Sequence, residues 1–73
     1  MTVITGNRQL AERARDIALH APAGTLTRRA AGCAAVALGT TNSLTAAREA
    51  LGLVRLDDVR QAALQLLDHL AER

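Results

Sequence analysis

The sequence contains no phenylalanine, tyrosine or tryptophan. Its hydrophobic core must therefore be built from leucine, valine, isoleucine and alanine, and alanine removes little apolar area from water. A chain of 73 residues forms one domain and buries only about 60% of the surface that it exposes when unfolded. We therefore expect a thin core that self-association supplements. The lack of aromatic rings also argues against binding of single-stranded nucleic acid, whose bases stack on such rings.

Cysteine occurs once, as Cys33. A single cysteine cannot form a disulfide within the chain, so we expect a reducing, cytoplasmic location. Cys33 lies in the least polar part of the sequence, where a buried structural thiol is expected rather than a reactive one. We expect no secretory signal peptide, and the longest apolar run, 30–39, is too short to cross a bilayer.

Lysine is absent, so all nine basic residues are arginine. Together with the abundant alanine, this composition indicates the codon usage of a G+C-rich bacterial genome. The net charge is +2, and it is unevenly distributed. Residues 1–38 carry five arginines against two acids, whereas residues 39–73 carry four arginines against five acids. The basic first half suits contact with a polyanion, and it equally suits an ordinary solvated helix surface.

Helix-capping residues divide the chain into four predicted helices. Asn7 is a good N-cap residue for the first helix, and Pro22 ends that helix because it disfavours helical backbone just before it. Thr25 or Thr27 caps the second helix, and Gly39 suits the left-handed position that ends it. The sequence therefore predicts a compact all-α bundle with helices at about 7–20, 26–38, 43–51 and 56–72, in a single domain 7–73 that follows a flexible or extended arm, 1–6.

Apolar residues recur at helical spacing in each predicted helix. Residues 30–38 contain no strongly polar side chain, which places the second helix in the middle of the fold. In the first and third helices the apolar residues share one face and are expected to point inward. These inward residues are Leu10, Ala14, Ile17 and Ala18 in the first helix, and Leu44, Ala47 and Leu51 in the third.

The last predicted helix carries an apolar seam at near-heptad spacing. An isolated helix of this length is marginal in water, so the seam must pack against something. It covers little more than two heptads, which favours packing within the chain's own core. Pairing with a second copy or with another protein remains open, and we treat the seam as the candidate partner interface. Its residues are Leu56, Val59, Ala63, Leu66 and Leu70.

These observations favour a small non-enzymatic regulator, adaptor or accessory subunit that acts through protein contacts and self-associates. We expect no catalytic residue, no metal, no cofactor, no membrane association and no small-molecule substrate. His20 and His69 have acids nearby, but such pairs are usually ordinary surface contacts, and a metal needs more ligands. No glycine-rich phosphate loop occurs either.

An alternative comes from the segment Ala35, Leu38, Gly39, Thr40 and Thr41. This pattern resembles the first helix and turn of helix-turn-helix DNA-binding proteins. The resemblance implies a transcriptional regulator whose third helix enters the major groove of duplex DNA. The family pattern expects apolar residues at two positions where this chain has Thr45 and Arg48. The contacts implied for DNA are Arg28, Arg29, Asn42, Ser43, Thr45 and Arg48.

A second alternative rests on Asn42, Ser43 and Leu44. This segment resembles the Asp-Ser-Leu segment where acyl and peptidyl carrier proteins take a phosphopantetheine arm. The resemblance implies a divergent carrier protein modified at Ser43. The chain departs from that family in having asparagine in place of the aspartate and a basic net charge. A role as helix N-cap also explains Ser43.

Overall fold

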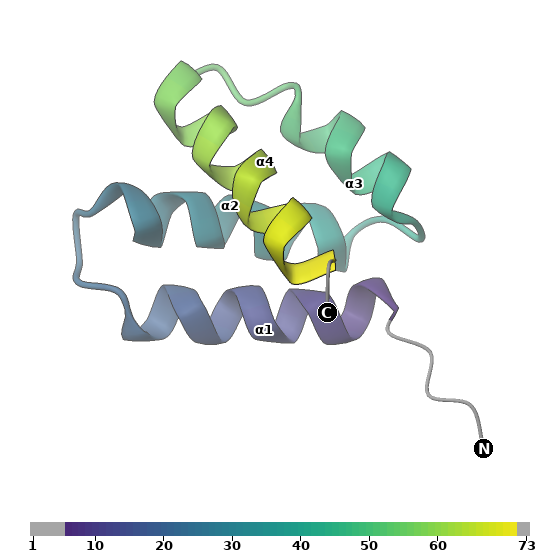
Figure 1. Cartoon of the computed structure of the whole chain (residues 1–73), viewed down its shortest axis with the longest axis horizontal. Coiled ribbons are helices and arrows are strands. Elements are labelled where there is room, and N and C mark those ends of the chain that lie inside the picture. The colour runs from purple at the N-terminus through teal and green to yellow at the C-terminus, as the bar shows by residue number, and fades with distance from the viewer. Residues whose placement is uncertain (1–5, 72–73) are drawn as a thin grey trace.

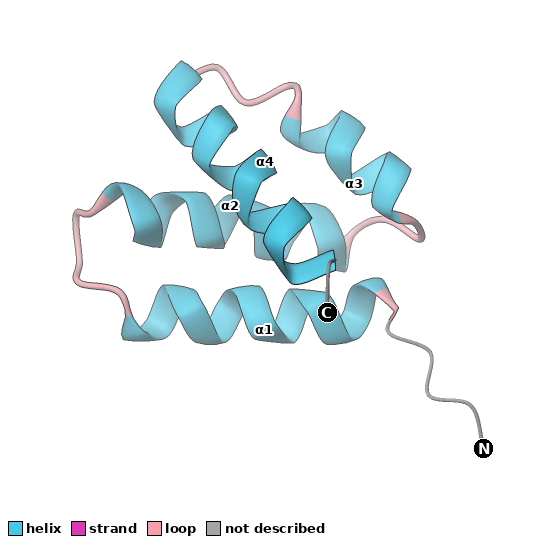
Figure 2. Cartoon of the chain, viewed as in Figure 1, coloured by secondary structure: helices cyan, strands magenta, loops and turns pink. Residues whose placement is uncertain are grey.

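The computed structural model describes residues 6–71 and confirms the predicted all-α bundle of four helices, with no strand in that range (Figures 1 and 2). The helices are α1 (Asn7–His20), α2 (Leu26–Gly39), α3 (Leu44–Leu51) and α4 (Asp57–Ala71). Apart from Gly6, the predicted N-terminal arm lies outside the described residues. The predicted end of the last helix at residue 72 also lies outside them.

Helix α2 is the centre of the bundle, because it contacts each of the other three helices. Helix α1 lies antiparallel beside α2, and α4 crosses over this pair (Figure 1). Helix α3 packs against α2 and α4. The apolar segment predicted to lie in the middle of the fold therefore does so. One side of α2 nevertheless stays open, since Val36 is 65% exposed.

The core contains one fully buried leucine from each helix, namely Leu10, Leu38, Leu51 and Leu67. Alanines fill the space between these leucines. Ala14, Ala31, Ala34, Ala47 and Ala63 are each completely buried, and they come from all four helices. Small side chains let the helix axes approach closely, which is how a chain without aromatic residues fills its interior. The prediction for Leu44 is wrong, because this side chain is 37% exposed.

Hydroxyl side chains cap two of the helices as predicted. The Thr25 Oγ1 accepts a hydrogen bond of 3.3 Å from the main-chain N–H of Arg28, at the start of α2. The Ser43 Oγ accepts one of 3.0 Å from the main-chain N–H of Ala46, at the start of α3. Each cap satisfies a donor that the helix itself leaves unpaired.

The predicted capping role of Asn7 is wrong. The N-cap of α1 is Gly6, and Asn7 is already the first helical residue. The Asn7 amide nitrogen instead reaches the turn between α2 and α3. It lies 3.0 Å from both the carbonyl oxygen and the Oγ1 of Thr41, and 2.9 Å from the Ser43 carbonyl oxygen. Asn7 therefore fastens the start of α1 to a turn more than thirty residues away.

The left-handed position predicted for Gly39 is also wrong. Gly39 lies inside α2, and Thr40 ends that helix by donating its N–H to the Val36 carbonyl oxygen across 3.0 Å. The Thr40 hydroxyl donates to the same Val36 carbonyl oxygen and the Thr41 hydroxyl donates to that of Ala37, so no left-handed residue is needed there. Among the described residues, positive φ occurs at Gly24 alone, with φ 83°, in the turn between α1 and α2.

Candidate functional site

An open groove of about 810 Å³ lies between α2, the end of α3 and the α3–α4 connection, residues 52–56. Its wall along α2 includes Arg29, Cys33 and Val36, and the C-cap residue Thr40 continues their helical spacing on the same face. The lining residues are Arg28, Arg29, Gly32, Cys33, Val36, Ala37, Thr40, Ala50, Leu51, Val54, Arg55, Leu56 and Val59.

Small residues on α2 and α3 leave this space empty. Gly32 contributes no side chain, and a Cβ added there would meet nothing within 4 Å. Ala37 and Ala50 line the same groove with a single methyl group each. Helix α3 is only eight residues long, so it ends before it can cover the first half of α2. The groove therefore results from a short helix packed against a helix of small residues.

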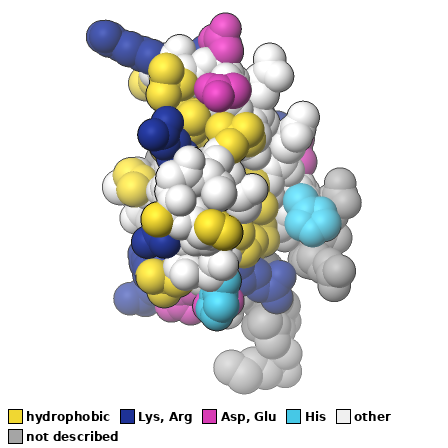
Figure 3. Space-filling model, turned by 90° about the vertical axis from the view of Figure 1, so that its left-hand side faces the viewer, with side chains coloured by type: hydrophobic (Ala, Val, Ile, Leu, Met, Phe, Trp, Pro, Cys, Tyr) yellow, Lys and Arg dark blue, Asp and Glu magenta, His cyan; other side chains and the backbone are white. Residues whose placement is uncertain are grey.

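Large apolar side chains remain exposed along this groove. Val36 is 65% exposed and Leu56 is 56% exposed, and both line it. Leu53, on the same α3–α4 connection, is 82% exposed. Exposed apolar residues are normal when scattered singly, but a cluster around a concavity is typical of a binding surface. Figure 3 views the bundle from the end at which α2 and α4 begin, and hydrophobic side chains are exposed there beside arginines.

The charged residues that line the groove are Arg28, Arg29 and Arg55, and none of its lining residues is acidic. The Arg28 guanidinium donates a hydrogen bond of 3.2 Å to the carbonyl oxygen of Ala21. Within residues 6–71, none of these three arginines forms an ion pair. The groove therefore combines an apolar lining with uncompensated positive charge.

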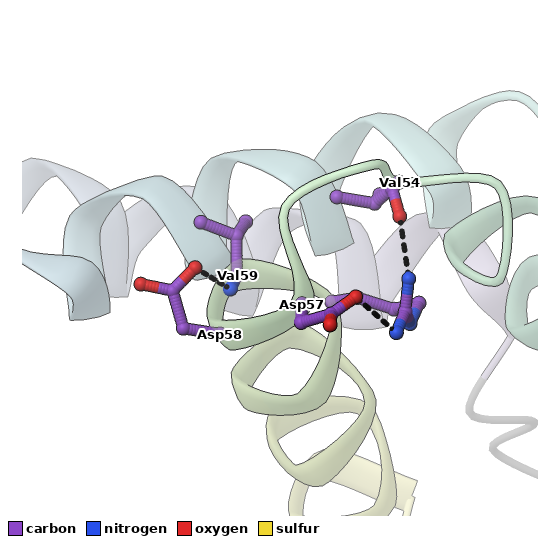
Figure 4. Close-up of polar contacts among 5 residues, drawn as sticks. Val54, Asp57, Asp58 and Val59 are labelled. Atoms are coloured by element: carbon purple, nitrogen blue, oxygen red, sulfur yellow. Dashed lines mark hydrogen bonds and ion pairs between the residues drawn. The ribbon is translucent and has the colours of Figure 1, made fainter.

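The α3–α4 connection is held in place from both sides (Figure 4). Its main chain bonds back to α3, through Leu53 N–H to the Ala50 carbonyl oxygen and Val54 N–H to that of Leu51. From α4, the Arg60 guanidinium donates a hydrogen bond of 3.1 Å to the Val54 carbonyl oxygen and one of 2.5 Å to the carboxylate of Asp57. This wall of the groove is thus formed before any ligand arrives, which lowers the entropic cost of binding.

Cys33 lines the groove and is half-buried, rather than fully buried as its apolar surroundings predict. The two histidines lie elsewhere. The Nδ1 of His20 lies 2.8 Å from the Asp16 carbonyl oxygen and 3.5 Å from its carboxylate, and both side chains are largely exposed. Within the described part of the chain, no three His, Cys, Asp or Glu residues gather where they could hold a metal ion.

The predicted partner interface on the last helix is mostly occupied by the chain's own core. Val59, Ala63 and Leu70 are buried, Leu66 is half-buried, and Leu56 lies exposed just before α4 begins. The buried stripe of α4 consists of Val59, Ala63, Leu67 and Leu70. Only the Leu56 end of the predicted seam lines the groove together with Val59.

The residues implied for DNA contact fall into two separate sets. Asn42, Ser43 and Thr45 are exposed at the start of α3, whereas Arg28 and Arg29 lie in the first turns of α2. About 15 Å of α2 separates Arg29 from the end of that helix at Gly39, beyond which the α3 set begins, because the helix rises about 1.5 Å per residue.

Arg48, the remaining residue implied for DNA contact, is engaged within the chain. Its guanidinium donates to the carboxylate of Asp68 on α4. This hydrogen bond, with the charge of Asp68, raises the pKa of Arg48 above its usual value. Arg48 therefore already has an anionic partner on α4.

The groove was not predicted from the sequence. The available signal was the spacing of Arg29, Cys33, Val36 and Thr40 on one face of α2.

Among residues 6–71, no helix is both long enough and apolar enough to cross a membrane. Comparison of the chain with protein-family models, with curated proteins and with solved structures gives no match.

Proposed function

We propose that this chain is a small non-enzymatic adaptor or regulator that acts by binding a protein segment in the groove between α2 and the α3–α4 connection. The observation that carries the proposal is the exposure of Val36 and Leu56 on the lining of an apolar groove. Covering such side chains removes apolar area from water, at roughly 25 cal/mol per Å². Within the described chain nothing covers them.

The seam on α4 supports a groove-based interaction over a coiled-coil one. Its residues Val59, Ala63 and Leu70 are needed to close the four-helix core, so they cannot also face a partner while the chain stays folded. The groove lining, by contrast, keeps Val36 and Leu56 exposed and available to a partner. A second copy of the chain is one possible occupant, in keeping with the self-association expected from a thin core.

Duplex DNA receives less support from the geometry. The arginine that the third helix would offer to phosphates, Arg48, is already paired with Asp68. Phosphate contacts require several cations on one surface, and those of α2 lie well away from the start of α3. The Ser43 hydroxyl, which the carrier-protein resemblance would modify, caps α3.

The proposal is tested with a display library of amphipathic peptides about 15 residues long, enough for four helical turns. Each peptide keeps apolar residues at i, i+3, i+4 and i+7, and its other positions vary equally among Glu, Lys, Gln and Ser. Selection on the wild-type chain is expected to yield binders that lose affinity for the Val36→Glu variant. Because Val36 is largely exposed, this variant is expected to fold normally.

Leu19→Glu is the matched control, since Leu19 is 68% exposed on α1 and does not line the groove. Binders should retain their affinity for it. Failure to obtain any Val36-dependent binder contradicts the proposed function. Sedimentation equilibrium over a range of concentrations then tests whether a second copy of the chain occupies the groove. A dimer that Val36→Glu abolishes would place another copy there.

A further inference from the structure

The charged side chains that line the groove are all positive. Arg28, Arg29 and Arg55 line it with no acid among the lining residues. Two other hollows, of about 610 and 490 Å³, include Glu12 and Asp16 respectively. Of these three hollows, the groove is the one whose charged lining residues are all arginine. An occupant gains most by bringing carboxylates to its edge.

From these features we propose that the occupant is an acidic amphipathic helix of a different protein, with its apolar face in the groove and its carboxylates against the arginines. This inference rests on the proposed function and specifies the partner. Among the common ways of recognising a peptide, strand addition needs a sheet edge, and residues 6–71 form no strand. Recognition of proline-rich segments needs an aromatic-lined groove, and the chain has no aromatic residue. Recognition of a phosphorylated or acidic motif uses clustered arginines and needs no apolar groove, so the apolar lining found here favours a helix laid in the groove.

A second copy fits this groove poorly. A symmetric dimer places the same surface of both copies face to face, so the three arginines of one copy would meet the three of the other. Helix α1, which exposes the large apolar residue Leu19, carries Arg8, Arg13 and Arg15 on its surface beside Glu12 and Asp16. It does not present the acidic face that the groove requires. Charge complementarity thus favours a different protein over self-association.

The peptides selected on the groove test this charge preference directly. Since Glu and Lys are equally frequent in the starting library, Val36-dependent binders are expected to be enriched in Glu over Lys. Synthetic binders with every Glu replaced by Lys should bind at least about tenfold more weakly at low salt, and the ratio should shrink as salt is added. A tryptophan in each peptide reports binding without background, because the chain contains none.

Charge reversal on the chain provides the complementary test. Arg29→Glu combined with Arg55→Glu should reverse the preference, so that the Lys-containing peptide binds better than the Glu-containing one. Arg8→Glu combined with Arg13→Glu is the matched control, because these arginines are exposed on α1 and lie outside the groove. The control should leave the preference for the Glu-containing peptide unchanged.

The possible failures are distinguishable. Val36-dependent binders that show no preference for Glu overturn the acidic helix while leaving the proposed function intact. The absence of any Val36-dependent binder overturns both. A dimer that occupies the groove, or Val36-dependent binding to phosphatidylglycerol vesicles without a Glu preference among peptides, would replace the acidic helix with a second copy or a lipid surface.

Discussion

The guanidinium of Arg60 donates a hydrogen bond of 3.1 Å to the main-chain carbonyl oxygen of Val54. This bond links α4 to the connection that forms one wall of the groove (Figure 4). We expect Arg60→Ala to lower the free energy of unfolding by about 1 kcal/mol, as for one lost hydrogen bond. It should also speed amide hydrogen exchange at residues 52–56 and weaken peptide binding. Arg13→Ala is the control; equal exchange rates in both variants would show that Arg60 does not hold the connection.

Substitutions at Gly32 test the stability of α2 and the occupancy of the groove separately. A Cβ at this helical position meets nothing within 4 Å, so Gly32→Ala should raise the free energy of unfolding by about 0.5–1 kcal/mol. Larger side chains at the same position should fill the groove, so Gly32→Leu should weaken peptide binding.

Gly39→Leu is the matched control for Gly32→Leu, because Gly39 also lies in α2 with open space around it but outside the groove. It should not weaken peptide binding. Urea unfolding followed by circular dichroism at 222 nm gives the stabilities. Unchanged peptide affinity of Gly32→Leu would show that the occupant does not enter the groove.

Leu67 tests the placement of the α4 stripe in the core. It is completely buried, and Leu67→Ala should cost about 2–5 kcal/mol of unfolding free energy because it leaves a cavity. Leu53→Ala, at a side chain 82% exposed, should change stability by less than about 0.5 kcal/mol. Similar urea midpoints for the two variants would contradict the buried position of Leu67.

Asn7 tests the tether between the start of α1 and the turn between α2 and α3. Its amide has two hydrogens for the acceptors of Thr41 and Ser43, so Asn7→Ala should lower the free energy of unfolding by about 1 kcal/mol. Asn42→Ala serves as the control, since Asn42 is exposed in the same turn. The tether is refuted if both variants unfold at the same urea concentration.

Much of the helical architecture could be predicted from local signals. Pro22 and the N-caps Thr25 and Ser43 set helix boundaries through contacts within a few residues, and such contacts are legible in the sequence. The position of Asn7 could not be read in this way. Its side chain hydrogen-bonds to a distant turn instead of capping its own helix, and tertiary contacts of this kind leave no local pattern in the sequence.

The candidate site could be predicted from the sequence less well than the helices, because the groove depends on how the helices pack. Leu56 and Leu66 fit the near-heptad spacing of the predicted seam, yet α4 buries Leu67 instead. With 3.6 residues per turn, Val59, Ala63, Leu67 and Leu70 share one face of the helix. Leu56 precedes the first turn of α4. The groove arises only where the short α3 fails to cover α2. The spacing that places Val36 on one face of α2 does not show that this face is uncovered, and the residues around Arg55 contain no pattern that indicates the groove.

Alkylation of Cys33 tests the occupancy of the groove most directly. Cys33 lines the groove and is the only thiol in the chain, so N-ethylmaleimide reports on this surface alone. A selected peptide, present at about ten times its dissociation constant, should slow alkylation of wild-type Cys33 by roughly tenfold. The same peptide should not slow alkylation of Val36→Glu. An unchanged alkylation rate with saturating peptide on the wild-type chain would contradict the groove as the binding site.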